Sequence, residues 1–430
     1  MSQSTRFLNV WRQPGRAVLL GVIASASLAG AAAAQETGQP GTSVKPLSLS
    51  AAIRDSVAGS APAAADEQAP AAPAQSADSA VLSFFRGTEL SGFVDTYYSY
   101  NFNKPSKPCV TAGGVAVFNC LRNFDVAHNS FSLSLAEVAL EKKPTAMSRG
   151  GFRVDLDYGP TTAYVHATEP GGTGIYQNIQ QAYLSYLAPV GSGLQLDFGK
   201  FVTLAGNEVI ESKDNWNYSR SLLFAWAIPY YHVGMRATYS VNDKFSVAGY
   251  LLNGWNDAAD NNTGKTVAVQ ATIKPTGALS IIENYVGGPE QPNNNSDWRH
   301  LTDTIVSYTV NKQVSVAANY DYGQETVLGS TVKWQGIAGY VRYQHNDWFA
   351  LTPRVEYYND RDGYTTGAAQ KVKEVTVTGE IKHKDGVMLR IEYRHDFSDV
   401  PFFLKNASEF KKNQGTFTLG LVYSFSSKTP

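Results

Sequence analysis

The sequence predicts an all-β fold, a transmembrane antiparallel β-barrel of about 16 strands, and three observations support this prediction. Apolar and polar residues alternate with period two along most of the chain from Thr88 onward, which is typical of strands with one buried face. Short and long connections alternate, as expected for a barrel with short periplasmic turns and long extracellular loops. Aromatic residues gather at strand ends, as at Tyr97-Tyr98 and Trp348-Phe349, where membrane–water interfaces favour them.

The N-terminal segment predicts export. Residues 1–16 are basic, residues 17–30 are small and apolar, and Ala32-Ala33-Ala34 fits a signal-peptide cleavage pattern. Residues 1–34 are therefore predicted to be a signal peptide. A retained transmembrane anchor is the alternative, and it is less favoured because the run is only weakly apolar for a spanning helix.

Residues 35–83 form a predicted periplasmic linker. They are rich in Ala, Pro, Ser and Gly, and no aromatic residue lies between Trp11 and Phe84. The stretch therefore lacks the large apolar side chains that a core needs, and we expect it to be largely disordered. A short docking helix over residues 47–57 is the alternative. The barrel is then expected to comprise residues 84–430.

Charge and cysteine content exclude several classes of protein. The formal net charge of −1 excludes a strongly basic nucleic-acid binder, so no nucleic acid is expected as a partner. Two cysteines are too few for a disulfide scaffold or a Cys-rich zinc site. In the oxidising compartment that export implies, Cys109 and Cys120 are expected to form a disulfide within one loop, worth roughly 3 kcal/mol on the chain-entropy model.

The strands and their connections follow from the same pattern. Residues 151–158, 387–394 and 416–425 each alternate strictly, and the longest apolar run after the signal, 222–228, is too short to cross a membrane as a helix. Short turns are predicted near residues 144–149, 189–193, 242–243, 275–277, 311–312, 346–347 and 385–386. Long polar loops are predicted near residues 103–128, 159–176, 204–229, 254–264, 287–300, 324–335, 359–370 and 398–413.

Two positions predict β-bulges. Pro353 falls within the predicted strand 348–359, where a closed barrel has no free edge to host a proline. In residues 131–140 the apolar phase changes after Leu135, which indicates an inserted residue. We expect a bulge at both positions.

Alternation alone does not separate a membrane barrel from a soluble sandwich, because both have one apolar and one polar face. An open sheet this wide would leave exposed edges, which closure removes, and closure also pairs every backbone group in lipid. A barrel of about sixteen strands leaves a water-filled lumen. The sequence therefore predicts a channel in the bacterial outer membrane, with lipid and lipopolysaccharide outside and small hydrophilic solutes inside.

The polar stripe of the strands is predicted to face the lumen. Basic and acidic side chains that face each other across water create a transverse field, which sorts solutes by charge and dipole. The alternative is that each arginine pairs with an acid on a neighbouring strand and only keeps the wall hydrated. The predicted pore-lining residues are Arg153, Asp155, Asp157, Asp197, Arg236, Arg342, Arg354, Glu356, Arg390, Glu392 and Arg394.

The third long loop, residues 204–229, is the predicted constriction. Its apolar part, residues 222–228, is unsuited to standing in water and would be buried against the inner wall. The acids of the loop would then face the arginines. The alternatives are that the loop packs at a subunit interface or caps the mouth. The predicted constriction residues are Glu208, Glu211, Asp214, Trp216, Tyr218 and Arg220.

Three stretches of the sequence resemble a known family. They are residues 92–105 (GFVDTYYSYNFNKP), 199–201 (GKF) and 217–221 (NYSRS), the last followed by Pro229, His232 and Gly234. These stretches are similar to those of the OmpL-like β-barrel porins of Gram-negative bacteria. The resemblance covers the chain after about Thr88 and implies an outer-membrane barrel whose solute is not specified. Porins of this width often form trimers, so a homotrimer is an open alternative to a monomer.

No enzyme is predicted. The sequence has no G-x-S-x-G, H-E-x-x-H or P-loop motif, and its seven histidines are scattered. No catalytic residue, metal site or cofactor is therefore expected. The predicted function is passive diffusion of small hydrophilic solutes or ions through a constriction lined by arginines and acids. The alternatives are a channel selective for anions or sugars, a plugged structural barrel, and an outer-membrane enzyme.

Overall fold

The computed structural model describes residues 87–169, 174 and 176–428. The predicted signal peptide, residues 1–34, and the predicted linker, residues 35–83, lie outside these ranges, so both stay predictions. No helix within the described ranges is long and apolar enough to cross a membrane.

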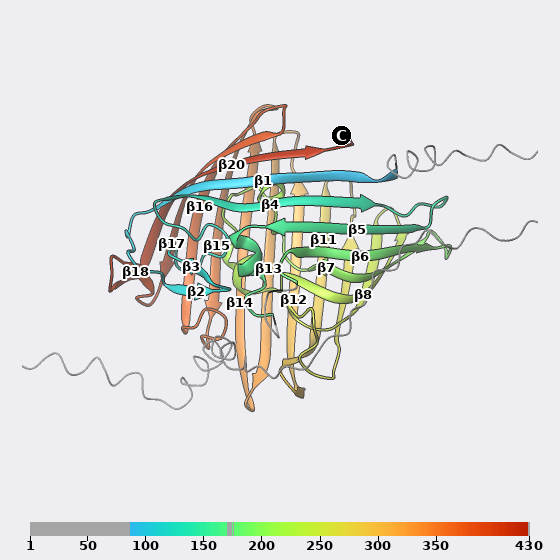
Figure 1. Cartoon of the computed structure of the whole chain (residues 1–430), viewed down its shortest axis with the longest axis horizontal. Coiled ribbons are helices and arrows are strands. Elements are labelled where there is room, and N and C mark those ends of the chain that lie inside the picture. Colours follow the sequence, from blue (N-terminus) through green and yellow to red (C-terminus); the bar gives the residue numbers. More distant parts are fainter. Residues whose placement is uncertain (1–86, 170–173, 175, 429–430) are drawn as a thin grey trace, which may run out of the picture. The chain divides into compact units, whose positions relative to one another are not determined.

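The described part of the chain forms one closed antiparallel barrel of sixteen strands (Figure 1). Strands that follow each other in the barrel pair with each other, and β1 closes the ring by pairing with both β20 and β4. The predicted fold class and strand number are confirmed. The barrel strands are β1 (Glu89–Asn101), β4 (Ser130–Lys142), β5 (Gly150–Tyr158), β6 (Ile179–Ala188), β7 (Leu194–Val202), β8 (Tyr231–Asn242), β9 (Phe245–Leu252), β10 (Thr266–Ile273), β11 (Leu279–Gln291), β12 (Asn294–Thr309), β13 (Val314–Val327), β14 (Ser330–Gln344), β15 (Phe349–Asp360), β16 (Gln370–Lys382), β17 (Val387–Ser398) and β20 (Asn413–Ser426).

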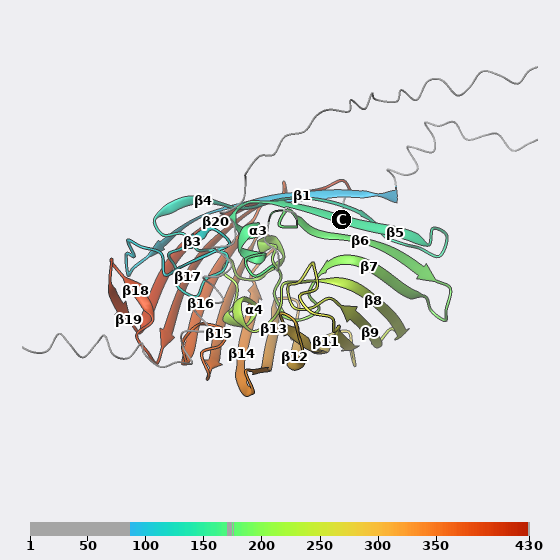
Figure 2. The same ribbon diagram turned by 60° about the horizontal axis from the view of Figure 1, so that its bottom comes forward.

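The remaining described elements belong to connections at one end of the barrel, which we call the loop end; the opposite end is the turn end. They are β2 (Val110–Ala112), β3 (Val115–Val117), α3 (Pro160–Val165), the 3₁₀ turn η1 (Ser212–Asp214), α4 (Leu222–Trp226), β18 (Phe403–Lys405) and β19 (Glu409–Lys411). Figure 2 shows α3 and α4 within the outline of the strand wall. Segments from the loop end therefore enter the lumen.

Strands such as β17 place apolar side chains outside and polar side chains inside. On β17, Ile391 and Tyr393 are exposed on the outer surface, whereas Arg390, Glu392 and Arg394 are buried on the lumen side. The outer surface suits lipid, and the closed ladder pairs the backbone groups that lipid cannot satisfy. The predicted orientation of the polar stripe follows from this alternation.

Two connections predicted as long loops are extended hairpins instead. β11 ends at Gln291 and β12 begins at Asn294, while β13 and β14 are joined by a two-residue turn, so the predicted loops 287–300 and 324–335 are wrong. Asn293 and Leu328 adopt the positive φ angles, 57° and 50°, that suit tight hairpin turns. These strands continue beyond the apolar band, where both faces are polar and the alternation that marks a strand is lost.

One of the two predicted bulges is present. The pairing of β1 with β4 shifts register between Asp95 and Thr96, which confirms the bulge predicted in residues 131–140. The bulge predicted at Pro353 is wrong, because β14 and β15 keep one register on both sides of that residue. A proline removes a hydrogen-bond donor but does not require an extra residue in the strand.

Candidate functional site

The loop of residues 204–229 crosses the lumen. The Gly206 N–H donates to Asp303 on β12 at 3.0 Å, and the Tyr218 hydroxyl donates to Asp95 on β1 at 2.9 Å. β12 and β1 lie on nearly opposite sides of the ring of strands. The loop is therefore held from two sides of the barrel.

The apolar part of this loop is buried inside the barrel. It forms α4, capped by Ser221, whose Oγ accepts from the Phe224 N–H at 3.0 Å. The Phe224 ring lies 5.8 Å from that of Phe124 and 5.5 Å from that of Tyr230, measured between ring centroids. This packing removes from water the apolar surface that makes an exposed position unfavourable.

Charged side chains on β15, β16 and β17 hold the loop. We call this set the loop clamp; its members are Arg354, Glu356, Glu374, Glu380, Arg390, Glu392, Arg394 and Asp396. Arg354 Nη1 donates to the Ser219 carbonyl at 2.7 Å and to Glu208 of the loop at 2.8 Å. Its Nε donates to Glu374 at 2.7 Å. One guanidinium thus joins a loop carbonyl, a loop carboxylate and a wall carboxylate, as its forked donors allow.

The glutamates of the clamp accept loop N–H groups. Glu356 accepts from the backbone N–H of Leu222 at 2.8 Å and of Leu223 at 3.0 Å. Glu392 accepts in the same way from Tyr218 at 2.7 Å and Ser219 at 3.0 Å. Each carboxylate therefore satisfies two neighbouring backbone donors that would otherwise be buried without a partner.

The clamp corrects the prediction that its arginines face open water. Arg354, Arg390 and Arg394 are each at most 1% exposed. Each is paired with a carboxylate of the clamp, at 2.7 Å for Arg354 and Arg390 and at 2.8 Å for Arg394. Arg394 Nη1 also donates to the Arg220 carbonyl at 2.6 Å. These arginines therefore pair directly with wall and loop carboxylates instead of facing the loop acids across open water.

The other predicted lining residues with a basic group lie nearer the turn end and are partly exposed. Arg236 pairs with Asp197 at 2.6 Å, and Arg153 pairs with Asp155 at 2.9 Å. Arg342 pairs with the clamp through Glu380 at 2.6 Å. Each of these arginines also has an acidic partner, which matches the alternative interpretation of paired charges on neighbouring strands.

The predicted constriction residues take different places. Glu208 and Tyr218 contact the wall as described above. Arg220 donates to the Tyr218 carbonyl at 2.7 Å and so braces the loop internally. Trp216 packs edge-on against an aromatic ring of β14. The Asp214 side chain is 54% exposed and pairs with Lys213 at 2.5 Å. Only part of the predicted set therefore meets the solvent of the lumen.

The remaining loop acid, Glu211, faces the wall made by β4 and β5. There Glu137 and Asp157 lie directly opposite each other in the strand ladder, and Glu211 lies within electrostatic range of both carboxyl groups. Glu137 is absent from the predicted lining residues, because the bulge in β4 shifts the alternation just before it. The outward position of Val138 in the same strand is the signal that could have placed Glu137 inside.

The first long loop packs onto the third. Cys109 and Cys120 form a disulfide within it. Arg122 pairs with Asp396 of the clamp at 3.0 Å, and Asn123 Nδ2 donates to the Ala225 carbonyl at 2.7 Å. Sequence reasoning does not find these contacts, because a loop has no periodic signal that indicates what it will touch.

His232, near the constriction in the sequence, is a buried wall residue. Its Nδ1 lies 2.8 Å from the Gly254 carbonyl, and its Nε2 lies 3.2 Å from the Thr203 hydroxyl. In the described part of the chain, no group of three or more His, Cys, Asp or Glu side chains is placed to hold a metal ion.

Comparison with known proteins identifies the family. The family model described as "Putative beta-barrel porin-2, OmpL-like" matches residues 87–425. The chain therefore belongs to this family of OmpL-like porins, and the resemblance noted in the sequence is confirmed. No curated protein sequence matches the chain.

Solved porin structures share the fold at low sequence identity. OmpF of Salmonella typhi, in complex with daunomycin, has a TM-score of 0.54 and 12% identity, over 79% of this chain and 97% of that one. An anion-selective porin from Comamonas acidovorans has a TM-score of 0.54 and 10% identity, over 79% and 99%. The outer-membrane channel DcaP of Acinetobacter baumannii has a TM-score of 0.50 and 13% identity, over 79% and 97%.

Family and barrel together define the class of this protein. It is a porin of the bacterial outer membrane, which acts as a passive channel. The predicted fold, localisation and general function are confirmed at this level.

Proposed function

We propose that small hydrophilic solutes and ions diffuse passively through a lumen that the loop 204–229 narrows. The loop clamp supports this proposal most directly, because buried hydrogen bonds between charged wall side chains and the loop backbone fix the loop across the barrel. A loop held in this way sets a constant size limit, whereas a free loop would admit solutes of varying size. Transport of this kind needs no covalent step and no cofactor, and we propose no catalytic role.

A plugged structural barrel is the second candidate function. The packing of the first loop on the third favours it, since Asn123 joins the first loop to the third and Arg122 joins the first loop to the wall strand β17. A plugged barrel and a narrowed channel have the same fold but differ in ion conductance.

Single-channel recording in planar lipid bilayers separates the two candidates. The purified full chain, shown to be folded by its heat-modifiable mobility on gels, is expected to give discrete conductance steps. Replacement of residues 212–218 by a flexible Gly/Ser segment removes the side-chain hydrogen bonds of Tyr218 with Asp95 and of Asn217 with Thr378, and should enlarge the steps. Asp214→Asn is the matched control, because it changes an exposed loop residue without releasing the loop. Folded protein that gives no steps at any voltage would overturn the channel and favour the plug.

We also propose that the protein assembles as a homotrimer. OmpT of Vibrio cholerae, which has a similar fold (TM-score 0.50, 12% identity, over 79% of this chain and 99% of that one), is described in a trimer form. Chemical cross-linking of the detergent-solubilised protein is expected to give a ladder that ends at three subunits. A single monomer band under conditions that cross-link a known trimeric porin would contradict the proposal.

A further inference from the structure

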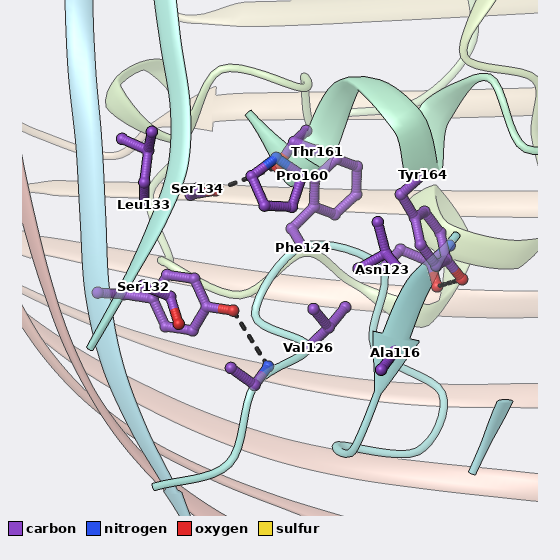
Figure 3. Close-up of a pocket in the computed structure, with 13 residues that line it drawn as sticks. Ala116, Asn123, Phe124, Val126, Ser132, Leu133, Ser134, Pro160, Thr161 and Tyr164 are labelled. Atoms are coloured by element: carbon purple, nitrogen blue, oxygen red, sulfur yellow. Dashed lines mark hydrogen bonds between the residues drawn. The ribbon is translucent and has the colours of Figure 1, made fainter. Parts of the chain in front are cut away.

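The outer surface of the barrel differs from strand to strand at the loop end. On β4 the outward side chains there are apolar, with Phe131 89% exposed and Leu133 46% exposed. Figure 3 shows Leu133 on the opposite side of β4 from the buried ring of Phe124, so Leu133 points away from the lumen. At the loop end of β16, the exposed side chains are instead Lys371 and Lys373. The outer wall is therefore basic on β16 and apolar on β4.

The alternation along β16 fixes the direction of both lysines. Val375 and Val377 follow them at every second position and are 46% and 40% exposed, whereas Glu374 between them is buried on the lumen side. Successive residues of a strand point to opposite faces of the sheet. Lys371 and Lys373 therefore project from the outer wall, in line with the two valines that face lipid.

The two lysines lie at the edge of the lipid-facing band. A transmembrane β-strand needs about 9–11 residues, so a span that starts at Lys382, the turn-end limit of β16, reaches about Lys373. Tyr357 and Phe397 occupy the ladder positions on either side of Lys373, and the membrane–water interface favours aromatic residues. The long loops of outer-membrane barrels are extracellular. The lysines therefore lie at the level of the headgroups of the outer leaflet.

The protein itself does not neutralise these lysines. Among the described residues, neither ammonium group forms an ion pair with a carboxylate; the exposed pair nearest in the sequence joins Arg361 to Asp362 at 3.7 Å. Asp399 accepts from the backbone N–H of Lys371 at 2.8 Å and not from its ammonium group. Basic groups beside a membrane surface attract anionic lipid headgroups. The outer wall of β16 thus presents two unpaired positive charges where such headgroups lie.

We propose that Lys371 and Lys373 form a binding site for the phosphorylated headgroup of lipopolysaccharide in the outer leaflet. Each ammonium group is a compact charge with three donors, and phosphate oxygens accept hydrogen bonds from such donors. The acyl chains of the same lipid lie along Val375 and Val377 below the lysines. The site is on the outer wall, so it goes beyond the proposed channel function and does not depend on it.

The test is native mass spectrometry of the full chain in detergent micelles, titrated with bisphosphorylated lipid A. Salt is kept near 0.1 M, where the Debye length is about 10 Å. The same lipid A without its phosphate groups is the comparison ligand, and inorganic phosphate is the competitor. The variants are Lys371→Gln, Lys373→Gln, the double glutamine variant and the double arginine variant. The matched control is Lys384→Gln, an exposed residue in the turn between β16 and β17. All variants are first checked for heat-modifiable mobility.

Each single glutamine variant should bind bisphosphorylated lipid A about fivefold more weakly, and the double glutamine variant about 25-fold more weakly, which is the factor that lysines contribute near an anionic lipid surface. The Lys384→Gln control and the double arginine variant should keep the wild-type affinity, because the charge on β16 is unchanged. Lipid A without phosphate should bind the wild type and the double glutamine variant equally.

Two results would overturn the lipid site. One is equal affinity of the wild type for the two forms of lipid A, and the other is a double glutamine variant that keeps the wild-type affinity. Displacement of lipid A by inorganic phosphate at an equal concentration would also overturn it, because the lysines would then recognise a free anion as well as they recognise the lipid.

Discussion

The two sides of the lumen contain the same residue types in different arrangements. On β15, β16 and β17, arginines and glutamates alternate across neighbouring strands, and each charge has a partner on the wall or on the loop. On β4 and β5, Glu137 and Asp157 face each other without a basic partner. The first side therefore holds the loop in place, whereas the second contains buried carboxyl groups that no described basic side chain pairs with.

We infer from this difference that pairing, rather than the presence of charge, decides what a lumen residue does. A buried charge with partners contributes mainly to positioning, since its field is cancelled nearby. An unpaired charge beside an aqueous passage acts on the solutes that pass. Three predictions test the two sides of this comparison and a fourth concerns a loop outside it, in order from the largest expected effect to the smallest.

Loss of a clamp arginine should have the largest effect. Arg354→Ala leaves Glu374 and Glu208 buried without their partner, and we expect the free energy of unfolding to fall by about 3–5 kcal/mol. Urea unfolding of the micelle-bound protein, followed by Trp fluorescence, measures this change. Arg361→Ala is the control, because Arg361 is mostly exposed and lies 3.7 Å from Asp362, so its loss should cost at most about 1 kcal/mol. Equal urea midpoints for the two variants would show that the clamp does not stabilise the barrel.

Steric disturbance of the clamp side should have an intermediate effect. Gly420 on β20 faces the Tyr218 ring, and a Cβ at this position would collide with it. Gly420→Val is therefore expected to displace the loop and to destabilise the protein by roughly 1–3 kcal/mol. Gly249→Val is the control, because nothing lies within 4 Å of its would-be Cβ. The same urea titration measures this change. A Gly420→Val protein with the wild-type free energy of unfolding would mean that the loop does not pack on β20.

Neutralisation of the unpaired wall should have little effect on stability. Asp157→Asn removes one of two facing acids that lack a donor, so we expect a change within about 1 kcal/mol, or a gain. Glu374→Gln, by contrast, weakens the pairing of both Arg354 and Arg394. It should lower the free energy of unfolding several-fold more than Asp157→Asn does. Parallel urea titrations give both values. If Asp157→Asn lowered the free energy of unfolding as much as Glu374→Gln, the acids of β4 and β5 would contribute to the stability of the barrel.

A pH effect confined to one loop should be the smallest. Burial, and then the charge of Glu290, raises the pKa of Asp257 to about 8. A raised acid pKa means that the folded loop binds more protons than the unfolded one between about pH 4 and pH 8, so its stability falls as pH rises through this range. Limited proteolysis of residues 253–265 should be faster at about pH 9 than at about pH 5 after correction for protease activity. Asp257→Asn should make the proteolysis rates at the two pH values equal. If the rates still differ in this variant, a group other than Asp257 causes the pH dependence.

Much of the barrel could be predicted from the sequence because its signal is local. In β17, the alternation of Ile391 and Tyr393 with Arg390, Glu392 and Arg394 is enough to assign the strand and both of its faces. The alternation no longer identifies a strand or its faces where one face is not apolar or where a residue is inserted. Strands that extend beyond lipid, such as β11 and β12, lose their apolar stripe, and the bulge in β4 moves Glu137 out of the expected phase.

The roles of the lumen residues were not predictable in the same way. The alternation of polar and apolar residues predicts that Arg354 faces the inside of the barrel. It does not predict that Arg354 donates to the Ser219 carbonyl of a loop far away in the sequence. The apolar surface of residues 222–228 indicated that this loop should be buried, which the structure shows. It did not indicate which wall residues the loop would contact. Contacts between distant segments decide whether an inward charge is paired, and these contacts have no periodic signature.

We propose that solutes pass through the lumen beside the clamped loop, along β4 and β5. Single-channel recording of Ala139→Cys, before and after a small cationic methanethiosulfonate reagent, tests it most directly, since both native cysteines are bound in a disulfide. The account predicts discrete steps that shrink on modification. Thr352→Cys, buried on the clamp side where Asn217 donates to the Thr352 carbonyl, should give steps that do not change. Steps of Ala139→Cys that do not shrink would contradict this solute path.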